Sequence, residues 1–103
     1  MDAEAWLNCT ITPGQFTGEY AVQAQAFDGQ GFSLFAWEDE LSCRDFPQGD
    51  QQACALLRVR VIEEQGDLCL IELPQQALEN GRLFTVKCDQ LTNKPVRVNQ
   101  INV

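Results

Sequence analysis

Five cysteines and no histidine determine which reactions the side chains of this chain can support. Successive cysteines are 34, 11, 15 and 19 positions apart, so none has the close spacing of a cysteine zinc knuckle. Without histidine, neither a Ser-His-Asp or Cys-His catalytic set nor a histidine-containing metal site can be assembled within the chain. We therefore expect no metal, no cofactor and mostly buried thiols, which belong to Cys9, Cys43, Cys54, Cys69 and Cys88.

Cys43 and Cys54 flank a segment rich in proline, glycine and glutamine, and this placement leaves a redox role open. An oxidisable pair would close that loop, provided that the two Cα atoms lie within about 7 Å of each other. A thiol-based redox or metal-binding protein is therefore one alternative function. The odd number of cysteines and their unpaired spacing favour free thiols in a reducing compartment.

Two groups of carboxylates are candidates for acid–base chemistry, the run Glu38, Asp39 and Glu40 and the later pair Glu63 and Glu64 with Asp67. Hydrolysis of a glycosidic bond needs two carboxyl groups that face each other about 5 to 10 Å apart across a cleft. Neighbouring residues of one turn do not provide that arrangement. We therefore interpret both groups as solvated turns and predict that the chain is not an enzyme.

The net charge of −8 is concentrated in the first half of the chain. Residues 1–51 contain nine acidic residues and a single base, Arg44, whereas residues 52–103 contain six acids and six bases. An acidic field repels phosphate groups, which basic side chains would have to neutralise. We therefore expect no nucleic-acid and no membrane partner. The charge serves either solubility alone or a basic protein partner.

Four aromatic residues of the first half are more than a small barrel can easily enclose. If some of them lie exposed beside the acids at 38–40, they form an apolar patch with an acidic rim, and such patches mark interaction sites. Packing in the core is the alternative interpretation. The hypothesis predicts a partner-binding surface and fails if the rings are buried; its residues are Trp6, Phe35, Trp37, Glu38, Asp39, Glu40 and Phe46.

Alternation of apolar and polar residues predicts the elements that position these side chains. We expect strands at residues 6–12, 19–27, 32–37, from about 55 onward, 68–73, 82–87 and 96–101. In the first of them, Leu7, Cys9 and Ile11 share one face. Glycine-bearing segments at 28–31 and 65–67 supply tight reversals. Residues 51–57 are ambiguous, because Asp50 could cap a short helix there.

The two halves of the chain resemble each other at a spacing of fifty residues. FSLFAWEDEL at residues 32–41 aligns with RLFTVKCDQL at residues 82–91, which places Asp39 over Asp89 and Leu41 over Leu91. The order of expected strands and turns upstream also agrees. We therefore predict one domain over residues 1–103, with three-stranded repeats at 6–41 and 57–91 and a final strand at 96–101.

The second half also resembles SH3-like small barrels in two stretches. These are V-x-V-x-E-E-x-G-D at residues 59–67 and V-x-x-D-Q-L at residues 86–91. The resemblance implies a fold and no particular function. Together with the short strands and frequent turns, it predicts an all-β fold, a small and mainly antiparallel SH3-like barrel of about seven strands.

The N-terminal sequence MDAEAW carries acids where a signal peptide would carry bases, and the chain has no apolar run long enough to span a membrane. We therefore expect an unexported, cytoplasmic protein. The leading hypothesis is a non-enzymatic protein-binding or accessory module. Besides the thiol-based alternative, a structural subunit of a homo-oligomer stays open.

Overall fold

The structure, a computed structural model, describes residues 3–79 and 81–93 of the chain. The described part consists of strands, two 3-10 turns and loops, and contains no α-helix. The all-β prediction is therefore confirmed. The expected strand at residues 96–101 lies outside the described residues. The strands are β1 (Ala3–Pro13), β2 (Glu19–Gln25), β3 (Gly31–Trp37), β4 (Leu41–Ser42), β5 (Ala53–Gln65), β6 (Leu68–Glu72), β7 (Leu83–Lys87) and β8 (Leu91–Thr92), and the 3-10 turns are η1 (Glu38–Glu40) and η2 (Cys88–Gln90).

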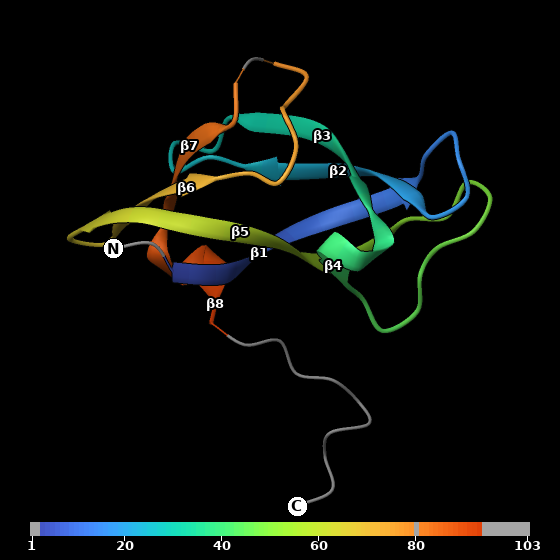
Figure 1. The fold of residues 1–103 in the computed structure, drawn as a ribbon, viewed down its shortest axis with the longest axis horizontal. Helices are drawn as coiled ribbons and strands as arrows, with labels where there is room; N and C mark the ends of the chain where they lie inside the picture. Colours follow the sequence, from blue (N-terminus) through green and yellow to red (C-terminus); the bar gives the residue numbers. More distant parts are fainter. Residues whose placement is uncertain (1–2, 80, 94–103) are drawn as a thin grey trace, which may run out of the picture.

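The described strands form one antiparallel sheet in the order β3-β2-β1-β5-β6-β7, with β4 paired to β5 and β8 paired to β1. Figure 1 shows that this sheet is strongly curled, so that β3 and β7 approach each other. There the Phe27 N–H donates to the Thr85 carbonyl at 2.9 Å, and the rings of Phe32 and Phe84 stack with centroids 4.3 Å apart. The expected small barrel is thus a curled half-barrel.

Period-two alternation places one face of each long strand in the core. On β1, the side chains of Leu7, Cys9 and Ile11 are buried, as predicted. The ambiguity at residues 51–57 is resolved in favour of a strand, because β5 begins at Ala53 and buries Leu57 completely. β1 and β5 pair along most of their length at the middle of the sheet, so their inward side chains form the centre of the core.

Positions fifty residues apart meet at the centre of the sheet. Leu7 on β1 lies opposite Leu57 on β5. Leu7 also lies opposite Leu91 on β8, and Leu57 lies opposite Leu41 on β4. Each central strand is therefore flanked by the short strand that ends the other half. These pairs describe the geometry, and an origin by duplication stays a prediction.

The two 3-10 turns are attached to the neighbouring hairpins by the same kind of backbone bond. The Glu38 N–H, at the start of η1, donates to the Gly18 carbonyl at 2.8 Å. The Cys88 N–H, at the start of η2, donates to the Asp67 carbonyl, also at 2.8 Å. The end of β3 is therefore fixed to the β1–β2 turn, and the end of β7 is fixed to the β5–β6 turn.

Candidate functional site

β3 presents two aromatic side chains on the outer face of the sheet. Its inward positions, Phe32, Leu34 and Ala36, are buried, so the intervening Phe35 and Trp37 point outward. Phe35 is 37% exposed and Trp37 is 44% exposed. The strand therefore places two partly exposed rings one strand repeat apart on a single face.

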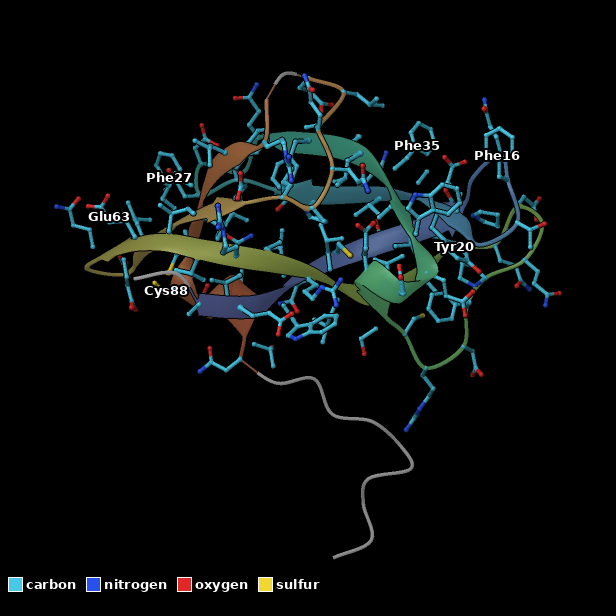
Figure 2. All side chains as sticks on the ribbon, viewed as in Figure 1. Phe16, Tyr20, Phe27, Phe35, Glu63 and Cys88 are labelled. Atoms are coloured by element: carbon cyan, nitrogen blue, oxygen red, sulfur yellow. The ribbon has the colours of Figure 1, made fainter. Side chains whose placement is uncertain are left out.

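The β1–β2 turn carries a third ring, Phe16, to the same end of the sheet (Figure 2). Glu19, the cross-strand partner of Trp37, shapes this turn: its Oε1 accepts the N–H of Phe16 at 3.3 Å, and its carbonyl accepts the N–H of Gly14 at 2.8 Å. A Cβ on Gly14 would lie 2.7 Å from the same carboxylate oxygen. It would also lie 2.9 Å from the Glu19 backbone oxygen, so any larger residue would require this turn to shift. Phe16 is 64% exposed as a result of its position there.

The acidic residues of η1 have different roles. Glu38 and Asp39 are exposed. Glu40 is engaged, because its Oε1 accepts the N–H of Trp37 at 2.9 Å and its Oε2 accepts a hydrogen bond from the Gln75 amide at 3.1 Å. Glu40 therefore fixes the 3-10 turn, whereas Glu38 and Asp39 supply exposed negative charge.

Two of the four aromatic residues named for this surface, Trp6 and Phe46, are not exposed, so they contribute no ring to it. Trp6 is only 8% exposed, because Arg58 on β5 and Thr92 on β8 flank it as cross-strand partners. Phe46 is partly buried, with its ring centroid 5.0 Å from that of Tyr20. The loop between β4 and β5, which carries Phe46, therefore folds back onto β2. The pKa of Tyr20 is raised first by partial burial and then by the charge of Glu38.

Five exposed residues at the end of the sheet formed by β3 and the β1–β2 turn make up what we call the acidic aromatic surface. They are Phe16, Phe35, Trp37, Glu38 and Asp39. Sequence reasoning missed Phe16. The signal that could have identified it is its setting in PGQFTG, where turn residues surround a lone ring and no strand is available to bury it.

Cys43 and Cys54, the predicted redox candidates, lie on adjacent segments. The Cys43 thiol donates to the carbonyl oxygens of Cys54 and Asp45, both at 3.4 Å, and partial burial raises its pKa. Their pairing as a disulfide stays a prediction. Cys9 fits the interpretation of a buried thiol, because it donates to the Ala55 carbonyl at 3.4 Å and burial raises its pKa to about 12.

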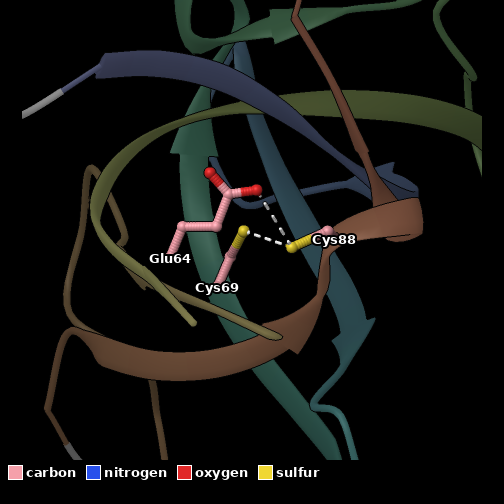
Figure 3. A group of neighbouring side chains, drawn as sticks. All are labelled: Glu64, Cys69 and Cys88. Carbon is pink, nitrogen blue, oxygen red and sulfur yellow. Dashed lines mark hydrogen bonds between the residues drawn. The ribbon is translucent and has the colours of Figure 1, made fainter. Parts of the chain in front are cut away.

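A second group of side chains, which sequence reasoning missed, lies at the end of the β5–β6 hairpin (Figure 3). The Sγ atoms of Cys69 and Cys88 are 2.8 Å apart, and the Cys88 Sγ is 3.7 Å from Oε2 of Glu64. All three potential ligand atoms lie within 4.8 Å of one another. We call this group the thiol–carboxylate cluster. It combines residues from β5, β6 and η2, and its spacing along the chain resembles no linear motif.

The cluster brings ionisable thiols beside a carboxylate, and this disfavours loss of the thiol protons. The pKa of Cys88 is raised to about 12, first by its hydrogen bond with Cys69 and then by desolvation and by the charges of Cys69 and Glu64. At neutral pH the Cys88 thiol is therefore protonated and donates toward Glu64. Cys69 is buried, Cys88 is half-buried and Glu64 is exposed, so the cluster opens to solvent on one side.

A shallow cleft of about 300 Å³ beside β5 is lined by three arginine side chains, Arg58, Arg60 and Arg82. Arg58 lies 3.5 Å from the Glu4 carboxylate, and Arg60 forms an ion pair with Glu72. Arg82 donates to two backbone carbonyls. These cations are engaged within the fold, so the cleft is not assigned a ligand.

None of the described residues forms a helix long and apolar enough to cross a membrane. The comparisons with family models, with curated proteins and with solved structures each found no match. The functional argument therefore rests on the two groups of side chains, the acidic aromatic surface and the thiol–carboxylate cluster.

Proposed function

We propose that the chain is a non-enzymatic protein-binding module whose acidic aromatic surface docks a basic segment of another protein. The observation that carries the proposal is the outward orientation of Phe35 and Trp37, with the exposed acids Glu38 and Asp39 directly after them. Exposed rings within a charged rim are typical of protein-binding surfaces, because aromatic side chains bury a large area and dominate interface energetics.

The sign of the charge selects the chemistry of the partner. The surface belongs to residues 1–51, in which Arg44 is the single base among nine acids. Complementary charge speeds association and disfavours wrong partners, and salt weakens the effect. A segment with lysine or arginine on either side of an apolar anchor fits both the rings and the rim. Nucleic acids and anionic membranes present phosphate, which the acidic rim repels.

The arrangement of the carboxylates supports a role without catalysis. Glu38 and Asp39 follow each other in one turn, and Glu40 is held by its bonds to Trp37 and Gln75. Neighbouring carboxyl groups of one turn do not provide the facing pair across a cleft on which glycoside hydrolysis depends. The five free thiols support a reducing compartment such as the cytoplasm as the place of this module.

The halves of the chain supply a matched variant for the test. We propose that the two halves are repeats. At a spacing of fifty residues, Phe35 and Trp37 on β3 correspond to Thr85 and Lys87 on β7. The double variant Phe35→Thr with Trp37→Lys therefore introduces residues that the sheet already holds at equivalent positions. Leu83→Ser, which changes a side chain that is 57% exposed on β7, is the control for nonspecific loss of surface hydrophobicity.

The experiment compares proteins captured from native lysate by the wild type, the double variant and the control. The proposal expects a basic protein that the wild type and Leu83→Ser retain and the double variant releases. The purified partner should bind the wild type more weakly as salt is raised. Equal retention by all three proteins, or no retained partner, would refute the proposal. Self-association of the wild type that the double variant abolishes in light scattering would instead establish the homo-oligomer.

A further inference from the structure

We propose that Glu64, Cys69 and Cys88 form a binding site for one thiophilic divalent cation of the zinc class, with the fourth coordination position open to water. The site is independent of the acidic aromatic surface and goes beyond the proposed function. It rests on the convergence of three ligand atoms from three elements, at distances close to those of a tetrahedral metal site.

The backbone brings the first two ligands together. Glu64 on β5 lies directly opposite Cys69 on β6, next to the tight turn that contains Gly66, whose φ is 63°. A bulge between Val61 and Glu63 shifts the pairing of β5 with β6 by one residue. Without this shift Glu63 would be opposite Cys69. Neighbouring strand residues point to opposite faces, so the bulge selects Glu64 as the carboxylate that faces the thiol.

The third ligand comes from the end of β7. Cys69 lies opposite Val86, two residues before Cys88, so Cys88 is the diagonal neighbour of Cys69 across β6 and β7. The bond from the Cys88 N–H to the Asp67 carbonyl at 2.8 Å holds η2 against the hairpin turn. Backbone hydrogen bonds therefore position all three side chains before any ligand binds.

The distance between Cys88 and Glu64 already fits a tetrahedral cation, and the distance between the two sulfur atoms does so after a small adjustment. With metal–sulfur bonds of about 2.3 Å and metal–oxygen bonds of about 2.1 Å, ligand atoms of a tetrahedral site lie about 3.5 to 3.8 Å apart. The Cys88 Sγ and the Glu64 Oε2 are already 3.7 Å apart. The two sulfur atoms, now 2.8 Å apart, must separate by about 1 Å, a distance that a side-chain rotation supplies.

The ligand types select the cation. Two thiolates with one carboxylate suit zinc-class ions, whereas calcium and magnesium require shells of oxygen ligands. Binding would release the thiol protons, and the resulting thiolates and the Glu64 carboxylate would share one cation. Because Glu64 is exposed and Cys88 is half-buried, water can occupy the fourth position from the solvent side. The bound ion would link β5, β6 and η2.

The test uses the full chain, reduced with a phosphine and freed of metal by a chelator. Cobalt(II) serves as the probe, because thiolate ligation gives it a charge-transfer absorption, and zinc is then added in competition. The proposal expects one equivalent of cobalt to bind with this absorption and to be displaced by zinc. Cys69→Ser and Cys88→Ser should each abolish the absorption or reduce it strongly. Glu64→Gln should weaken binding at least about tenfold.

Glu63→Gln is the matched control, because it removes the same charge from the adjacent residue on the opposite face of β5. Both glutamates are exposed, so neither change is expected to unfold the chain, and circular dichroism checks this point. Equal effects of Glu63→Gln and Glu64→Gln would overturn the proposal, as would unchanged binding in Cys69→Ser and Cys88→Ser or no binding at all. A disulfide joining Cys69 and Cys88 that resists the phosphine would also overturn it.

Discussion

Replacement of Leu57 by alanine tests the sheet register on which both candidate sites depend. The Leu57 side chain is fully buried and lies opposite Leu7 on one side and Leu41 on the other. A buried Leu→Ala change costs about 2.7 to 5 kcal/mol, with the higher values where the surroundings cannot collapse into the cavity. Hydrogen-bonded strands flank Leu57 on both sides, so we expect a loss in the upper half of that range.

The loss should be large compared with the total stability. A domain of this size has a free energy of unfolding of about 5 to 15 kcal/mol, so Leu57→Ala should remove about a quarter of it or more. The melting temperature should fall by more than about 12 °C, since 1 kcal/mol corresponds to about 4 to 8 °C in a domain of up to 100 residues. Leu83→Ala, at a side chain that is 57% exposed, should change the free energy by less than about 1 kcal/mol.

Urea unfolding under reducing conditions measures these differences, with tryptophan fluorescence as the signal because Trp6 is buried in the folded chain. Leu7→Ala should cost about as much as Leu57→Ala, since Leu7 occupies the corresponding central position. Because the two side chains are cross-strand partners, the double variant should show a coupling of at least about 0.5 kcal/mol. Similar stabilities of Leu57→Ala and Leu83→Ala, or strict additivity of the central pair, would refute the register.

Three further predictions concern the turn, the surface ring and the buried thiol. Gly14→Ala should destabilise the β1–β2 turn and shift the resonances of Glu19, because the added Cβ would lie 2.9 Å from the Glu19 backbone oxygen; unchanged spectra would contradict this. Trp37→Ala should leave stability within about 1 kcal/mol of the wild type. It should weaken partner binding up to roughly 100-fold. The reason is that burying the exposed 44% of a side chain of about 250 Å² contributes about 2.7 kcal/mol to binding. Calorimetry measures both the stability of the variant and its affinity for the partner. Burial raises the pKa of Cys9 to about 12 from an ordinary value of 9.0, so the folded chain keeps a proton that the unfolded chain releases above pH 9. Its contribution to stability should therefore fall as pH rises through this window, by at most about 1.4 kcal/mol per pH unit. Urea titrations of Cys9→Ser, in which this part of the slope should vanish, check the sign.

Strand positions could be predicted from the sequence because alternation is a local property. The inward residues of β1, Leu7, Cys9 and Ile11, were identified correctly for this reason. The burial of Trp6 depends instead on β8, a strand of two residues that pairs with β1 from the other end of the chain. No local sequence pattern predicts the pairing of β8 with β1. Alternation alone therefore indicates only that this ring lies on the face opposite Leu7.

The thiol–carboxylate cluster shows a different limit of sequence reasoning. Alternation predicts that Glu63 and Glu64 point to opposite faces, and it does not predict which of them faces Cys69. The bulge after Val61 makes that choice through the tertiary pairing of β5 with β6. Cys88 joins only because β7 returns beside β6. The spacing of 19 residues between the two thiols therefore carries no signal until the register is known.

Both candidate sites occupy corresponding corners of the sheet. Glu38 begins η1 and Cys88 begins η2, and each is fixed by its backbone N–H to the turn of the neighbouring hairpin, at Gly18 and Asp67 respectively. Because these bonds use only backbone atoms, the scaffold places no demand on the side chain at either position. One corner carries aromatic rings and free carboxylates, and the other carries two thiols and a carboxylate. A shared backbone geometry can therefore support a protein-docking surface in the first half and a cation site in the second, and substitutions at one corner should leave the other intact.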